Sequence, residues 1–172
     1  MPEMPETPEL KPLSPSAVAG ALEKALRYRL LNEPMEAESI CRDVLDVQPD
    51  HHEALVTLIL SLTDQFDRYR SGLIDEARTL VARLGDAYSR EYYAGILWER
   101  HAKARYRRGG PGAGFAAHAE LGQAMEHFDK AVAIRPAGND EAVLRWNACV
   151  RFLDRFPDIT PAPEEAPEPL LE

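Results

Sequence analysis

Apolar residues recur at intervals of three and four along most of the chain, which is the spacing of one face of an α-helix. No segment shows the alternation of apolar and polar positions that a half-buried strand requires. The pattern predicts an all-α protein. We expect helices over about residues 15–31, 35–47, 53–65, 73–84, 88–107, 115–134 and 141–156.

Proline and glycine separate these segments. Ser14-Pro15 is typical of a helix start, because serine caps the first turn and proline is tolerated within it. Pro34 ends the first segment, since the residue before a proline is disfavoured in helical conformation. The sequence GGPGAG at 109–114 predicts a loop between the two longest helices.

The two ends of the chain have a different composition from the middle. Residues 1–13 and 157–172 are rich in Pro and Glu, which neither propagate a helix nor bury apolar area. We therefore expect two disordered acidic tails around one helical domain, residues 14–156. A domain of this size can bury a hydrophobic core of its own.

One sequence pattern occurs twice. Ala37, Cys41 and Val44 precede Pro49 with the same spacing at which Ala124, Phe128 and Ala131 precede Pro136. This A-x3-F-x2-A-x4-P spacing resembles the second half of a tetratricopeptide repeat (TPR). Residues 18–51 then form one unit of the family's 34-residue length.

Two further units follow less regularly. Ala77 and Val81 match the family's second helix six residues late, and about ten extra residues precede Ala124. The resemblance covers about residues 18–154. It implies antiparallel helix pairs stacked as a short TPR-like superhelix, with about three repeats and a C-terminal capping helix. A plain helical bundle is the alternative.

Charge and composition narrow the class of protein. The net charge is −9, and the tails carry most of it, so the middle of the chain is nearly neutral. Nucleic-acid binding is not expected, because it usually needs a broad basic face. No apolar run is long enough to cross a membrane, and the acidic N-terminus does not resemble a signal peptide. Two cysteines without metal-binding spacing fit a reducing cytoplasm, and the preference for arginine over lysine hints at a bacterial source.

The sequence offers little that points to catalysis. The five histidines form no HExxH or ExxH motif, and GGPGAG lacks the strand and the Lys-Ser/Thr of a phosphate-binding loop. There is no GxSxG nucleophile motif. We therefore predict a non-catalytic protein without a metal or another cofactor.

Basic residues cluster around Tyr106, and this cluster is either a solvated helix face or a docking patch for an acidic segment. Its members are Arg100, Lys103, Arg105, Arg107 and Arg108.

The TPR resemblance implies a binding module, in which the first helix of each pair lines a concave groove for a peptide or a partner helix. Helical periodicity assigns the groove to Leu22, Leu26, Arg29, Val56, Leu60, Glu99, Lys103, Tyr106 and Arg107. TPR domains that clamp a chaperone's C-terminal carboxylate need Lys and Asn where this chain has Leu22 and Leu26.

The expected ligand is therefore a protein segment with apolar anchors and acidic residues. The chain's own tail, residues 163–172, has both and is a candidate competitor. An alternative function is a small bacterial TPR chaperone for secretion or complex assembly.

Overall fold

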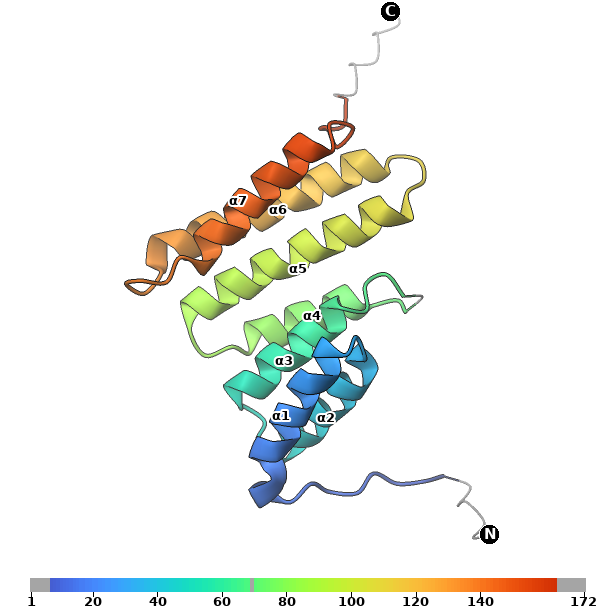
Figure 1. Cartoon of the computed structure of the whole chain (residues 1–172), viewed down its shortest axis with the longest axis vertical. Coiled ribbons are helices and arrows are strands. Elements are labelled where there is room, and N and C mark those ends of the chain that lie inside the picture. The colour runs from blue at the N-terminus through green and yellow to red at the C-terminus, as the bar shows by residue number, and fades with distance from the viewer. Residues whose placement is uncertain (1–6, 69, 164–172) are drawn as a thin grey trace, which may run out of the picture.

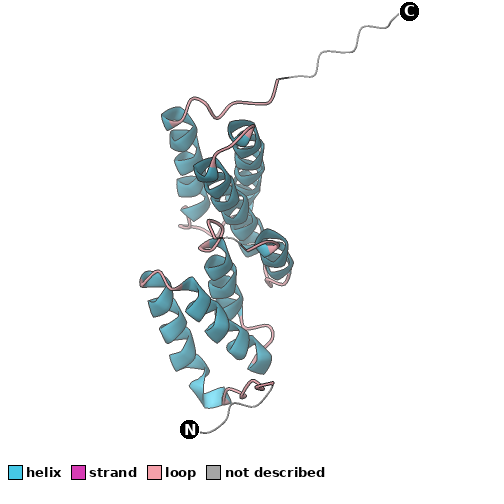
Figure 2. Cartoon of the chain, turned by 90° about the vertical axis from the view of Figure 1, so that its right-hand side faces the viewer, coloured by secondary structure: helices cyan, strands magenta, loops and turns pink. Residues whose placement is uncertain are grey.

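The computed structural model describes residues 7–68 and 70–163, and within these ranges all regular secondary structure is helical (Figure 2). A 3₁₀ turn, Pro15–Ala17, leads into the first of seven α-helices in the described residues. The helices are α1 (Val18–Leu30), α2 (Pro34–Val47), α3 (His52–Thr63), α4 (Leu73–Ala82), α5 (Ala87–Arg108), α6 (Ala113–Ile134) and α7 (Glu141–Arg155). The predicted all-α class and the seven predicted segments are confirmed.

Local sequence signals set several helix ends. Asp86 caps α5, because its carboxylate accepts a hydrogen bond from the backbone N–H of Ser89 at 2.8 Å. The His51 ring accepts one from the N–H of Ala54 at 3.3 Å and caps α3 in the same way. Gly109 follows the last turn of α5 with φ of 71°, a conformation that side-chain-bearing residues rarely adopt.

The helices form two layers. Each helix packs against the next one along the chain, and α1, α3, α5 and α7 also contact one another in that order (Figure 1). Among the described residues, α2, α4 and α6 make no contact of similar extent with one another. The odd-numbered helices therefore form one layer and the even-numbered helices the other.

The core consists of two apolar clusters along this stack. One joins α1 to α4 and the near side of α5, and the other joins α5, α6 and α7. Residues at the repeated spacing lie in both clusters, and each is fully buried with 0% of its surface exposed. They are Ala37, Cys41, Val44, Ala124, Phe128 and Ala131.

The packed structure continues past the predicted boundary at residue 156. Ile159 is only 5% exposed and packs against the second cluster. The hydroxyl of Tyr106 donates to the carboxylate of Asp158, whose backbone carbonyl lies against Gly114. The expectation of disorder from residue 157 is therefore wrong for this short segment, because one isoleucine among the prolines packs into the apolar cluster of α5, α6 and α7.

The rest of the two predicted tails is only partly within the described residues. Residues 7–13 have no helical structure, and Leu13 is partly buried against the first cluster. Residues 1–6 and 164–172 lie outside the described part of the chain, so their predicted disorder stays a prediction. None of the helices described here is long and apolar enough to cross a membrane.

Candidate functional site

A polar pocket of about 350 Å³ opens where the C-terminal ends of α1 and α3 meet the second half of α5. We call it the basic pocket, and we call the side of α1, α3 and α5 that carries it the odd-helix face. Four cationic side chains and two carboxylates line it, so its charge is opposite to that of the whole chain. The lining residues are Arg29, Asn32, Thr63, Asp64, Asp67, Arg100, Lys103 and Arg107.

Two arginines share one carboxylate at the floor of the pocket. The Nε of Arg29 lies 2.8 Å from Asp64, and a terminal nitrogen of Arg100 lies 2.6 Å from its other oxygen. Arg100 also donates to the Thr63 hydroxyl at 2.7 Å. Burial lowers the pKa of Arg100, yet arginine starts so high that it stays charged at neutral pH. One of the two positive charges therefore has no matching carboxylate in this group.

The rim of the pocket is more exposed than its floor. Arg107 contacts Asp67 at 2.7 Å, and both side chains are more than half exposed. Asp67 belongs to the connection between α3 and α4, so this ion pair joins that connection to α5. An exposed ion pair of this kind contributes little stability, which leaves Arg107 available to a ligand at small cost.

Lys103 is held by a buried carboxylate. The carboxylate of Glu99, which is 0% exposed, forms ion pairs with Lys103, one turn further along α5, and with Arg145 of α7. The Lys103 ammonium also lies 4.9 Å from the ring centre of Phe152. Glu99 was assigned to the groove from periodicity, and that assignment is wrong because its carboxylate is enclosed between α5 and α7.

Apolar side chains lie beside the basic pocket on the same face. A second pocket, at the other end of this face, is lined by Ala19 and Glu23 of α1 and by Glu53 of α3. Leu26 and Leu30 lie on the same side of α1 as Ala19 and Glu23, because these four residues are spaced three to four apart along the helix. Leu26 is 39% exposed and Leu30 is 88% exposed.

On α3, two partly buried apolar residues lie between the second pocket and the basic pocket. Val56 and Leu60 follow Glu53 at helical spacing and precede Asp64. We call Leu26, Leu30, Val56 and Leu60 the apolar strip. It connects the two pockets along the odd-helix face.

Two other predicted groove residues offer little or no surface between the two pockets. Leu22 lines the second pocket, but it is only 3% exposed and contributes mainly to the first cluster of the core. Tyr106 faces α7, where its ring packs against Phe152 and Phe156 and its hydroxyl holds Asp158. Of the nine predicted residues, only Arg29, Lys103 and Arg107 line the basic pocket.

The basic pocket also contains residues that the predicted groove omitted. Arg100 was predicted as a member of the basic cluster, and it stands at helical spacing from Lys103 and Arg107, with which it lines the pocket. Asp64 and Asp67 follow the end of α3, where no periodic pattern applies. Only their position beside α5 shows that they contribute to the pocket.

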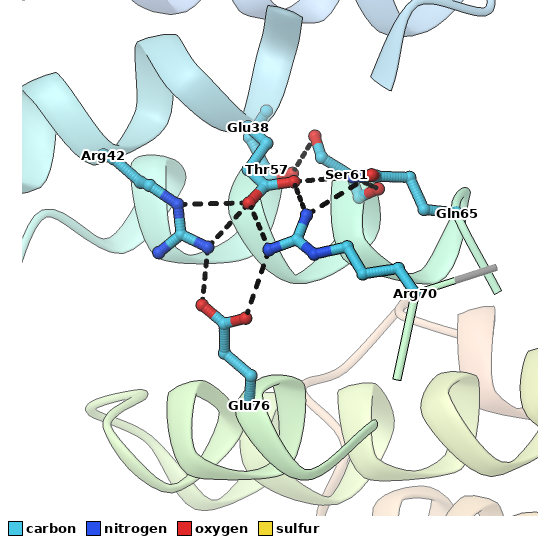
Figure 3. Close-up of polar contacts among 7 residues, drawn as sticks. All are labelled: Glu38, Arg42, Thr57, Ser61, Gln65, Arg70 and Glu76. Atoms are coloured by element: carbon cyan, nitrogen blue, oxygen red, sulfur yellow. Dashed lines mark hydrogen bonds and ion pairs between the residues drawn. The ribbon is translucent and has the colours of Figure 1, made fainter. Parts of the chain in front are cut away.

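A separate polar network fixes the connection between α3 and α4 (Figure 3). Glu38 of α2, which is 6% exposed, accepts hydrogen bonds from Arg70 and Gln65 at 2.7 Å each and from Arg42 at 2.7 Å. Glu76 of α4 accepts from Arg42. Burial by itself would raise the pKa of Glu38, but the hydrogen bonds outweigh it and lower the pKa to about 2.

This network makes stability depend on acid. Glu38 ionises near pH 4.5 in the unfolded chain and near pH 2 in the fold, so its contribution is complete above pH 4.5 and is lost as the pH falls to 2. We expect Glu38→Gln to cost about 2 kcal/mol at pH 7, less than the full shift because both arginines are partly exposed. Urea titrations at several pH values measure it. The difference between variant and parent should shrink towards pH 2, and a constant difference would contradict this account.

The described residues show no arrangement suited to metal chemistry. Within residues 7–68 and 70–163, no group of three or more His, Cys, Asp or Glu side chains is placed to hold a metal ion. Burial raises the pKa of both Cys41 and Cys149 to about 12, which keeps these thiols protonated and unreactive at neutral pH.

The basic pocket and the apolar strip give the odd-helix face three features that a ligand can use: cationic side chains, exposed leucines and hydrogen-bond donors. Comparison with protein-family models, with curated proteins and with solved structures gives no match to this chain. The case for its function depends on the geometry of this face.

Proposed function

We propose that this protein is a non-catalytic binding module that holds an extended or helical segment of a partner protein along the odd-helix face. The observation that carries the proposal is the basic pocket, whose cationic residues come from α1 and α5 while α3 supplies the carboxylate between them. A ligand in this position would contact three helices at once. Acidic residues of the ligand would meet the basic pocket, and apolar residues would meet the apolar strip.

The layered packing supports a TPR-like superhelix as the architecture of this module. In such a stack the first helix of each pair lines the groove, and here α1, α3, α5 and α7 contact one another on one side. The small residues Ala37 and Ala124 are fully buried in the second helices of their pairs, where the family needs close approach. Pro49 and Pro136 follow the ends of those helices and let the chain reverse.

The test is capture of a partner by charge- and leucine-altered variants. Arg107→Glu should weaken capture most at low salt, because exposed charges act mainly over the screening length of about 10 Å at 0.1 M salt. Leu26→Asp should reduce capture at every salt concentration, because apolar anchors carry most of the affinity. Affinity capture from native lysate with quantitative mass spectrometry measures both.

Two matched controls separate the odd-helix face from the surface in general. Arg108→Glu makes the same charge change one residue along α5, outside the basic pocket. Leu144→Asp alters a leucine on α7 that is 64% exposed. A partner that is lost with both test variants and kept with both controls supports the proposal. Equal capture by all four variants would rule out the odd-helix face as the binding site.

Lys103 is a poor choice for charge reversal. A glutamate there would face the buried carboxylate of Glu99, so lost binding could reflect damage to the fold.

A further inference from the structure

We propose that the C-terminal segment, residues 163–172, docks on the odd-helix face of its own chain, with its glutamates in the basic pocket and its two leucines on the apolar strip. The inference takes this face from the proposed function but does not depend on any partner protein. It identifies the chemistry that the face accepts, an acidic segment with two neighbouring leucines, and names one occupant.

The fold anchors the chain just before this segment at the C-terminal half of α5. Asp158 accepts a hydrogen bond from Tyr106 at 2.9 Å, and Ile159 is buried against the second cluster of the core. Tyr106 is next to Arg107 in α5, but its ring faces α7, whereas Arg107 lines the basic pocket. The segment therefore starts on the α7 side of α5 and must pass over α5 to reach the pocket.

The remaining chain is long enough to cross the face. Neighbouring packed helices lie about 8–10 Å apart, so the path from the α7 side of α5 over α3 to α1 spans about 30 Å. The eleven residues from Ile159 to Leu170 reach up to about 36 Å when extended. The segment can therefore reach Leu26 and Leu30 in an extended conformation.

The charges are complementary. The basic pocket has four cationic side chains against two carboxylates. The segment has four glutamates and no basic residue, so two of its carboxylates would balance the two excess positive charges of the pocket. The glutamates are Glu164, Glu165, Glu168 and Glu172.

The order of side chains along the segment matches the order of features across the face. From α5 to α1, the face presents first the cations of α5 and then Arg29 with the leucines of α1. Starting from Ile159, the segment presents Glu164 and Glu165, then Glu168, and then Leu170 and Leu171. Each contact can form without the segment reversing its direction.

Weak contacts are sufficient because the two parts are joined. A short tether gives an effective concentration of about millimolar, so a segment that binds with only millimolar affinity as a free peptide would be half docked. The same segment would compete with any partner that uses the face.

The experiment uses the full chain with a spin label at Pro169→Cys, a position that leaves every glutamate and leucine of the segment in place. Cys41 and Cys149 are fully buried with raised pKa values, so the label reacts with the new thiol alone. At about 10 mM salt, amide signals of residues 26–32 should lose most of their intensity in ¹H–¹⁵N spectra. The loss should be reversed at about 1 M salt, where screening is about 3 Å.

Matched variants identify the contacts. Replacing Glu164, Glu165 and Glu168 together by Gln should restore the signals, whereas replacing Glu3, Glu6 and Glu9 by Gln should not. Arg107→Glu should restore them in part, and Arg108→Glu should leave the effect unchanged. A label at Pro8→Cys should leave residues 26–32 unaffected.

Two results would overturn the proposal. One is full signal intensity at residues 26–32 in the labelled parent at low salt. The other is the same signal loss in a mixture of two proteins, one with the spin label but without ¹⁵N and one with ¹⁵N but without the spin label. A loss in that mixture would arise between molecules, so the segment would dock on a second copy and not on its own chain. Neither result bears on capture of a partner, so failure here is distinct from failure of the proposed function.

Discussion

Ala124→Arg and Ala37→Arg are each expected to unfold the protein or to lower its stability by about 4 kcal/mol or more. Both alanines are fully buried, on α6 and α2. An arginine at either position would separate packed helices and bring a charge without a partner into the core. Since domains of this size are stable by about 5–15 kcal/mol, little folded protein should remain. Circular dichroism during thermal and urea unfolding measures the effect.

The control for this prediction lies on the same helix. Ala119 is exposed on α6, so Ala119→Arg makes the same chemical change without entering the core and should change stability by less than about 0.5 kcal/mol. If Ala124→Arg melted like the Ala119→Arg control, the packing of α6 against α5 described above would be wrong.

Gly95→Ala is expected to destabilise the protein by about 2 kcal/mol, although alanine favours helix over glycine by about 1 kcal/mol. A Cβ at Gly95 would lie 2.4–2.9 Å from three ring carbons of Phe128. Phe128 is fully buried, so its ring has no free space to move into. The absence of a side chain at Gly95 is what allows α5 and α6 to approach. Urea unfolding with a linear extrapolation measures the change.

A matched glycine and a second substitution test that explanation. Gly122 is exposed on α6 with no atom near its absent Cβ, so Gly122→Ala should stabilise by about 0.5–1 kcal/mol. Phe128→Leu should cost less stability in the Gly95→Ala background than in the parent. Equal costs in the two backgrounds would show that the two residues do not contact each other.

The sequence by itself determined the secondary structure. Apolar spacing places a helix wherever one face must be buried, and Ser14, Pro34, Gly109 and Pro136 interrupt the pattern where helices begin or end. These signals are local, so they can be read without knowing which helices meet. The twofold A-x3-F-x2-A spacing also marked residues that are fully buried, because close helix packing requires small side chains at fixed intervals.

The sequence determined less of the candidate site. Periodicity shows which side of a helix a residue occupies, but it does not show whether another helix covers that side. Leu22 and Glu99 were assigned to an open groove, and the packing of the helices buries both. Ile159 was assigned to a disordered tail, and the apolar cluster of α5, α6 and α7 buries it.

Only the tertiary structure decided which charges share a site. Arg29 and Arg100 are far apart in the chain and meet at Asp64 because α1 and α5 lie on either side of α3. Asp67 reaches Arg107 because Arg70, bound to the buried carboxylate of Glu38, holds the connection between α3 and α4. Helix periodicity is a property of neighbouring residues, whereas the composition of a pocket depends on contacts between distant ones, and packing in three dimensions sets those contacts.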